Sequence, residues 1–97
     1  MTWESISEAQ RRLIRQLADN RQRLVRTRNQ ASFYDAVAED PMDKMAGDAV
    51  SKVASARTVK ALVAHRILAW TGKDDDKELF AVLTEKGRLI ATVSANN

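Results

Sequence analysis

The chain has 97 residues, of which 44% are hydrophobic and 30% are charged, and its net charge is +3. This length allows one domain with its own core, and the balance of apolar and charged residues excludes a disordered or collagen-like chain. Cysteine is absent, which excludes a disulfide framework, a cysteine nucleophile and every thiolate metal site.

The sequence also indicates a compartment and a predominant secondary structure. Its amino-terminal residues lack a positively charged segment followed by an apolar stretch, so we expect no signal peptide. No apolar run approaches the roughly 18 to 20 residues that cross a bilayer. Together with the lack of cysteine, these features predict a cytoplasmic protein with no membrane segment. Three glycines and one proline, in a chain rich in alanine, arginine and leucine, predict mostly helix.

The first predicted element is a long helix over residues 5–28, capped by Ser5 or Ser7. Its apolar residues recur at helical spacing and form a stripe on one side of the helix. We favour packing of this stripe within the chain, and the alternative is dimerisation. The dimerisation candidates on the stripe are Leu13, Leu17 and Leu24. A second helical piece over residues 32–38 ends before Pro41, so the predicted helical region covers residues 5–40.

Residues 42–66 are predicted to contain two short helices. The period is weak before Val50, where the chain offers a turn or a short helix. Apolar residues then recur at helical spacing as far as Ile67, and Ser55 interrupts them as the cap of a new helix beginning at Ala56 or Arg57.

The last part of the chain is predicted to form a hairpin and a helix. Two stretches rich in β-favouring residues flank the polar connection 72–77, which makes residues 67–83 a β-hairpin. Thr84 then caps a helix over residues 85–93.

Two short motifs resemble a known family. The run from Ser55 to Leu68, with Thr58-Val59-x-x-Leu62 inside it, resembles the recognition helix of winged helix-turn-helix regulators of the MarR and PadR kind. The run Leu83-Thr84-Glu85-Lys86-Gly87-Arg88 is similar to the Leu-Thr-x-x-Gly-Arg that ends the wing in that family. The resemblance covers residues 48–93. It implies a mainly α fold with a small β-hairpin, in which residues 1–97 form one winged-helix domain with a long N-terminal helix.

Charge is distributed unevenly along the chain. Residues 35–48 carry one lysine against five carboxylates, whereas residues 49–72 carry Lys52, Arg57, Lys60 and Arg66 with no carboxylate. An acid-free segment is a plausible footprint for a polyanion, because phosphates meet no like charge there. The alternative is an ordinary solvated helix face.

A helix over Arg57–Arg66 would turn Val59, Leu62 and Val63 inward and present cations and alanines on its outer side. Such a surface suits the major groove, where long cations reach guanine or phosphates and alanines allow close approach. The predicted DNA contacts are therefore Ser55, Arg57, Thr58, Lys60, Ala61, Ala64 and His65, and the candidate phosphate contacts are Lys52, Arg11, Arg12 and Arg15. For each residue alone, the competing interpretation is a cap or a hydrated side chain.

These observations predict sequence-specific binding of double-stranded DNA by a small, dimeric transcriptional regulator. The alternative is a winged-helix protein-interaction module, such as an adaptor or a phage or plasmid accessory protein, because a fold does not dictate nucleic-acid binding. Asp74, Asp75 and Asp76 at the hairpin tip are expected to stay away from DNA and to be solvated, not to bind a metal. His65 is the single histidine, and no nucleophilic pattern or phosphate-binding glycine loop exists, so we expect neither an enzyme nor a cofactor.

Overall fold

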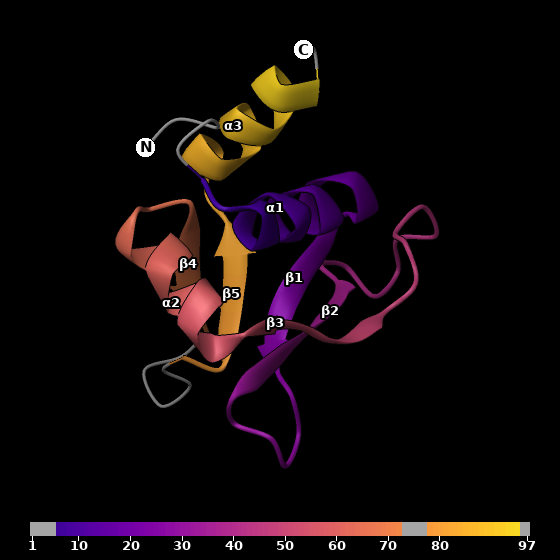
Figure 1. Cartoon of the computed structure of the whole chain (residues 1–97). Coiled ribbons are helices and arrows are strands. Elements are labelled where there is room, and N and C mark those ends of the chain that lie inside the picture. The colour runs from indigo at the N-terminus through magenta and orange to yellow at the C-terminus, as the bar shows by residue number, and fades with distance from the viewer. Residues whose placement is uncertain (1–5, 73–77, 96–97) are drawn as a thin grey trace.

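The computed structural model describes residues 6–72 and 78–95, which contain one antiparallel sheet (Figure 1). Its five strands lie in the order β3-β2-β1-β5-β4. The central strand β1 pairs with β2 on one side and with β5 on the other. The strands are β1 (Gln22–Arg26), β2 (Phe33–Ala38), β3 (Val50–Ser55), β4 (Leu68–Thr71) and β5 (Phe80–Leu83).

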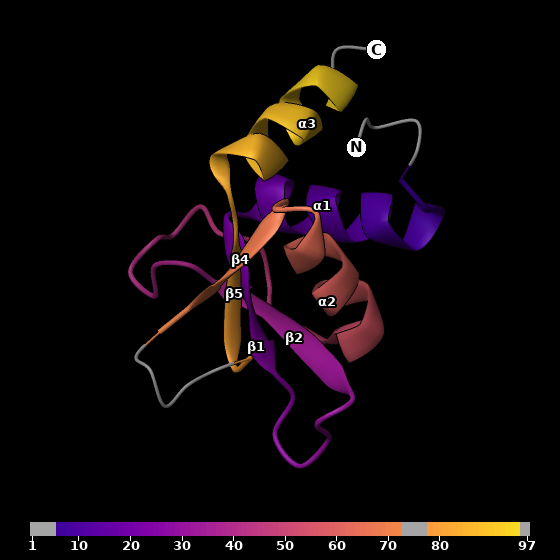
Figure 2. The ribbon, with the colours of Figure 1, turned by 90° about the vertical axis from the view of Figure 1, so that its left-hand side faces the viewer.

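The described helices are α1 (Glu8–Asn20), α2 (Ala56–Ala64) and α3 (Glu85–Ala95). Each begins at a hydroxyl cap: Ser7 accepts from the N–H of Gln10, Ser55 from that of Thr58, and Thr84 from that of Gly87. Figure 2 shows α1 and α2 on the same side of the sheet, with α3 beyond one end of it. None of the described helices is both long enough and apolar enough to cross a membrane.

The core lies between the sheet and the two helices α1 and α2. Alternate strand residues point toward these helices, so Leu24, Tyr34 and Ala81 are fully buried on neighbouring strands. The helices contribute the other half of the core with Leu13, Ile14, Leu17, Val59 and Leu62. One apolar cluster therefore fixes α2 against the sheet by its inner side and leaves its outer side to solvent.

The predicted helix over residues 5–28 is wrong beyond Asn20. Arg21 adopts a left-handed conformation with φ of 53°, which ends α1, and the chain then turns into β1. Leu24 lies seven residues after Leu17, so its spacing continues the helical stripe although it belongs to a strand. The helical piece predicted over 32–38 is also wrong, because Phe33, Tyr34 and Val37 belong to β2, which pairs with β1 along its length. The helical region 5–40 therefore does not exist as predicted.

The predicted fold class, mainly α with a small β-hairpin in a winged helix-turn-helix, is wrong. Residues 50–55 form the edge strand β3, so no helix immediately precedes α2 and residues 42–66 are not a helix-turn-helix. The helix from Ala56, the hairpin of β4 with β5, and the helix after Thr84 are confirmed. However, β5 also pairs with β1, so the hairpin is part of the five-stranded sheet of an α+β fold and is not a projecting wing. The tip Asp74-Asp75-Asp76 lies outside the described residues.

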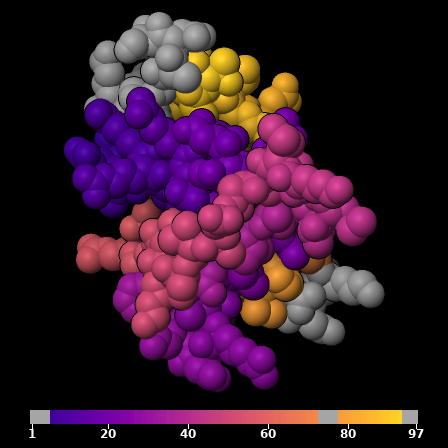
Figure 3. Space-filling view, turned by 90° about the vertical axis from the view of Figure 1, so that its right-hand side faces the viewer, coloured from indigo at the N-terminus to yellow at the C-terminus, as the bar shows by residue number. Residues whose placement is uncertain are grey.

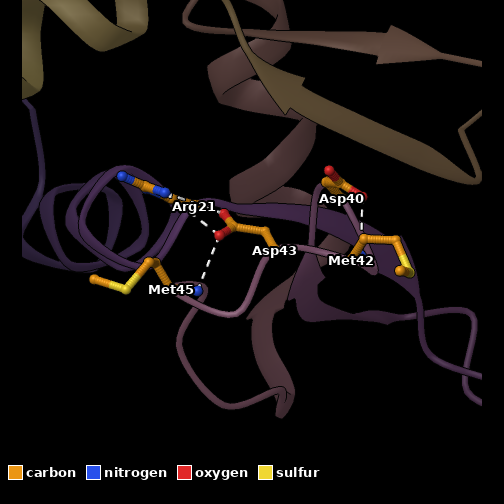
Figure 4. A network of polar contacts seen from close by, with 5 residues as sticks. All are labelled: Arg21, Asp40, Met42, Asp43 and Met45. Atoms are coloured by element: carbon orange, nitrogen blue, oxygen red, sulfur yellow. Dashed lines mark hydrogen bonds and ion pairs between the residues drawn. The ribbon is translucent and has the colours of Figure 1, made fainter.

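The loop of residues 39–49 shows why a helix does not form before β3. The Asp40 carboxylate accepts the N–H of Met42 at 2.9 Å, and the Asp43 carboxylate accepts that of Met45 at 2.9 Å (Figure 4). Asp43 also pairs with Arg21 at 3.4 Å. These side chains supply the hydrogen bonds that a helical backbone would otherwise make, and they hold the segment as successive turns.

Candidate nucleic-acid interface

The outer side of α2 is exposed and carries no carboxylate. Val59 and Leu62 are fully buried against the sheet, whereas Arg57, Lys60 and Ala64 are exposed. This division follows from the helical period, which places residues three, four and seven positions apart on the same side. The helix therefore presents two cations, followed by Ala61 and Ala64, on its outer side, as the sequence predicts for this segment.

Arg57 is exposed, and no carboxylate of the described residues lies within 4.0 Å of its guanidinium. Lys60 differs, because its Nζ lies 3.6 Å from Glu78 Oε2. Both side chains in that pair are about half exposed, at 54% for Lys60 and 43% for Glu78. Exposed pairs of this kind contribute about 0 to 1 kcal/mol. A phosphate can therefore replace Glu78 beside Lys60 at small cost.

The amino end of α2 is held by bonds within the chain. Ser55 Oγ accepts the N–H of Thr58 at 3.3 Å and lies 3.1 Å from Thr58 Oγ1. The N–H of Ala56 donates to the carbonyl of Ser32 at 2.8 Å. The capping interpretation of Ser55 and Thr58 is thus what the structure shows. The first turn of α2 still contains no acidic residue, so the positive end of the helix dipole is not neutralised by its own side chains.

The carboxyl end of α2 adds two exposed residues, His65 and Arg66. Arg66 adopts a left-handed conformation with φ of 62°, which turns the chain toward β4. The carbonyl of His65 accepts a bond from Lys86 at 3.1 Å, and that of Arg66 accepts one from Thr84 at 2.6 Å. These bonds attach the exposed end of α2 to the start of α3 and so hold its side chains at a fixed place.

The predicted phosphate contacts on α1 lie in the same layer as α2, because both helices cover one face of the sheet (Figure 2). Arg12 is exposed and pairs with Glu8 at 3.4 Å, Arg15 is exposed, and Arg11 is half-buried. The surface of α1 lies directly against that of β3 in Figure 3. The three arginines therefore lie on a helix that packs beside α2, and Glu8 stands among them.

Lys52 is exposed on β3, the edge strand, with a left-handed φ of 52°. Its N–H donates to Asp35 Oδ1 at 2.7 Å, and Thr27 Oγ1 donates to the same atom at 2.5 Å. The N–H of Lys52 and the hydroxyl of Thr27 hold the pKa of Asp35 below its usual value, against the opposing effect of burial. The Lys52 charge thus has a carboxylate on the neighbouring strand, which makes it a weaker candidate than Arg57.

The dimerisation surface predicted on the first helix is not available in the folded chain. Leu13 is 3% exposed, Leu17 is 1% exposed, and Leu24 is fully buried in β1. The structure therefore assigns all three leucines to the core of one chain, which is the interpretation that the sequence favoured.

The acidic part of the chain lies on the other side of the molecule from α2. Residues 39–49 carry Glu39, Asp40, Asp43 and Asp48, and this loop stands opposite α2 in the views of Figures 1 and 2. The fold thus places the carboxylates of this loop away from α2.

Comparison with known proteins supplies no relative. The chain matches no family model, no curated protein and no solved structure. The resemblance to winged-helix regulators therefore has no support beyond its two motifs, and the structure gives the second motif a local role. Thr84 caps α3, and Gly87 allows that helix to approach the carbonyl of Ile67.

Three charged residues near α2 were not found by sequence reasoning. Arg26 and Glu78 lie 3.4 Å apart beside Lys60, and Arg28 is exposed in the turn between β1 and β2. That turn lies beside the start of α2, because Ser32 bonds to Ala56. The sequence predicts Arg26 and Arg28 in the helix over residues 5–28, and the pairing of β1 with β5 brings Arg26 to Glu78, so no local pattern indicates this group.

Proposed function

We propose that the protein binds double-stranded DNA through the outer side of α2. The observation that carries this proposal is Arg57, exposed and without a carboxylate partner among the described residues, on a helix face that has no acid. The nine residues of α2 span about 14 Å, which suits entry into a major groove.

The proposal gives the exposed side chains of α2 different contacts with DNA. Arg57 reaches base edges or phosphates, and Ala61 and Ala64 allow the helix to approach the bases closely. Lys60 and His65 contact the backbone on either side, and Arg28 adds a phosphate contact from the neighbouring turn. The helix-turn-helix is not required, because any helix exposed on a rigid layer can enter the groove. In this account the protein acts as a small cytoplasmic transcriptional regulator.

Duplex titration at several salt concentrations tests the proposal. Each phosphate contact contributes about 0.9 to the slope of log affinity against log salt concentration. The double variant Arg57→Ala/Lys60→Ala should therefore weaken binding and reduce this slope by about 2. Selection from random duplexes then shows whether binding depends on sequence.

A matched control removes the same amount of charge elsewhere. Lys44 is exposed in the loop of residues 39–49, and Arg88 lies on α3 paired with Glu39 at 2.9 Å. The double variant Lys44→Ala/Arg88→Ala should retain most of the wild-type slope. Equal losses from both double variants would contradict a specific role for α2 and leave only a general effect of net charge.

The alternative is a protein-interaction module, and one observation favours it. Leu89 and Val93 lie one helical turn apart on α3 and are 59% and 58% exposed. Exposed apolar residues on one side of a helix are suited to contact with a partner protein. Absence of salt-sensitive binding to any duplex at low salt would favour this alternative. Met42 and Met45 are also exposed, but they point in opposite directions and do not form one patch (Figure 4).

A further inference from the structure

One carboxylate oxygen lies between two cations that come from different elements. Glu78 Oε2 is 3.4 Å from Arg26 Nη2, at the end of β1, and 3.6 Å from Lys60 Nζ, on α2. Glu78 stands two residues before β5 and has a left-handed φ of 63°. Elements distant in sequence thus bring three charges together at the side of α2.

The Arg26 side chain is held in place by the core beneath it. Its guanidinium lies 5.9 Å from the centre of the Tyr34 ring, and Tyr34 is fully buried. The hydroxyl of Tyr34 donates to the carbonyl of Glu78, and the N–H of Arg26 donates to the carbonyl of Leu79 at 2.8 Å. The positions of the arginine and of the Glu78 backbone are therefore set by the sheet.

The hydrogen bonding of the Arg26 guanidinium is incomplete. Its Nε is buried and has no hydrogen-bond partner within residues 6–72 and 78–95. A buried donor without a partner is uncommon and calls for an explanation. The contacts of Glu78 are also longer than the 2.7 to 2.9 Å, approximately, of a strong bond between a cation and a carboxylate. Glu78 thus satisfies neither Arg26 nor Lys60 fully.

A phosphate is better matched to this pair of cations than one carboxylate oxygen is. The guanidinium of arginine presents a planar set of donors that suits two phosphate oxygens, and a lysine ammonium can bind a third. Lys60 lies one turn from Arg57 on the outer side of α2, so a nucleic-acid backbone that follows this helix passes the pair.

We propose that Arg26 and Lys60 form a phosphate subsite for the nucleic-acid ligand, and that Glu78 fills it in the free protein. The inference rests on the proposed function and deepens it, because it names where one backbone phosphate binds. Glu78 leaves Arg26 and Lys60 when the phosphate enters, and its carboxylate is then solvated.

The test uses Glu78→Gln, which removes the charge and keeps the size of the side chain. Inorganic phosphate is titrated into the wild type and the variant, and the side-chain NMR signals of Arg26 and Lys60 are followed. We expect the dissociation constant for phosphate to fall about threefold in the variant, the size expected when an exposed ion pair is lost. Lys60→Ala in the Glu78→Gln background should abolish the gain.

Glu39→Gln is the matched control, because it removes the same charge from another arginine pair, with Arg88, after the far end of β2. An equal gain in this control, or no gain in Glu78→Gln, would overturn the subsite. A duplex titration of the same proteins separates the two proposals. Phosphate binding at Arg26 and Lys60 without duplex binding would support the subsite and contradict the proposed function. Duplex binding that is sensitive to Arg57→Ala and insensitive to Glu78→Gln would support the proposed function and contradict the subsite.

Discussion

Arg57 is the residue on which the proposed interface depends most. Its charge is exposed and has no carboxylate partner in the described part of the chain, whereas Lys60 and Arg12 each have one. The two existing pairs are exposed, so water screens them and they add little to stability. Exchange of these carboxylates for phosphates therefore requires no rearrangement of the core.

Asp35 differs from Arg57, because its carboxylate accepts hydrogen bonds from other residues of the same chain. The N–H of Lys52 and the hydroxyl of Thr27 bond to its carboxylate and lower its pKa from the usual value of 3.8. A carboxyl whose pKa is lower in the folded state stabilises the fold above the unfolded pKa. That contribution is lost as the pH falls through the folded value, which lies below 3.8.

The variant Asp35→Asn should therefore be less stable than the wild type at pH 7, by about 1 kcal/mol, the usual worth of such hydrogen bonds. The difference should decrease as the pH is lowered past 3.8. Chemical unfolding at a series of pH values measures it, with Asp48→Asn, an exposed position before β3, as the control. A difference that is constant over this range would show that the charge of Asp35 contributes nothing.

At the scale of elements, the run Leu83-Thr84-Glu85-Lys86-Gly87-Arg88 acts as a junction between β5 and α3. The Thr84 hydroxyl accepts the N–H of Gly87 at 3.1 Å and donates to the carbonyl of Arg66 at 2.6 Å. A Cβ at position 87 would lie 2.4 Å from the Ile67 carbonyl oxygen and 2.9 Å from Leu83. Gly87 is thus required for close approach of α3 to the chain that leaves α2.

Gly87→Ala should destabilise the protein although alanine is the better helix former. Alanine in a free helix gains about 1 kcal/mol over glycine, but here the backbone carbonyl of Ile67 must move. We expect a net loss of about 2 kcal/mol, the usual size for an overpacked site. Thermal unfolding measures the loss, and Thr92→Ala on the exposed side of α3 should be close to neutral. A more stable Gly87→Ala protein would contradict this packing.

The same elements show how much of the fold could be predicted. Ser55 and Thr84 are hydroxyl caps before apolar periods, and this local signal placed α2 and α3 correctly. The strands within residues 22–38 could not be predicted from the sequence. Leu24 continues the helical spacing of Leu17, and arginine is a residue that favours helices. These strands form by pairing with each other and with β5 and β3, and such pairing does not appear in a local sequence pattern.

The candidate site also has one part that the sequence predicts and one part that it does not. The helical period alone predicts that Arg57 and Lys60 lie outside and that Val59 and Leu62 lie inside, and the structure agrees. The approach of Glu78 to Lys60 could not be predicted, because it depends on the position of β5 beside β1.

At the scale of the whole molecule, the fold places the acidic loop and the helix α2 in different regions. The helices α1 and α2 share one side of the sheet, while the acidic loop of residues 39–49 lies away from α2 (Figures 1 and 2). The net charge of +3 is therefore distributed unevenly over the molecule. If α2 binds DNA as we propose, this distribution steers the polyanion toward that helix.

Titration of the ¹⁵N-labelled protein with a DNA duplex, followed by amide chemical shifts, tests the central claim most directly. The account predicts that the largest shifts fall on residues 55–66 and on the turn of Arg28, with residues 39–49 and α3 nearly unchanged. The shifts should also decrease as salt is raised, since counterions are released on binding. Spectra in which α2 does not respond to any duplex at low salt, or in which α3 responds instead, would contradict it.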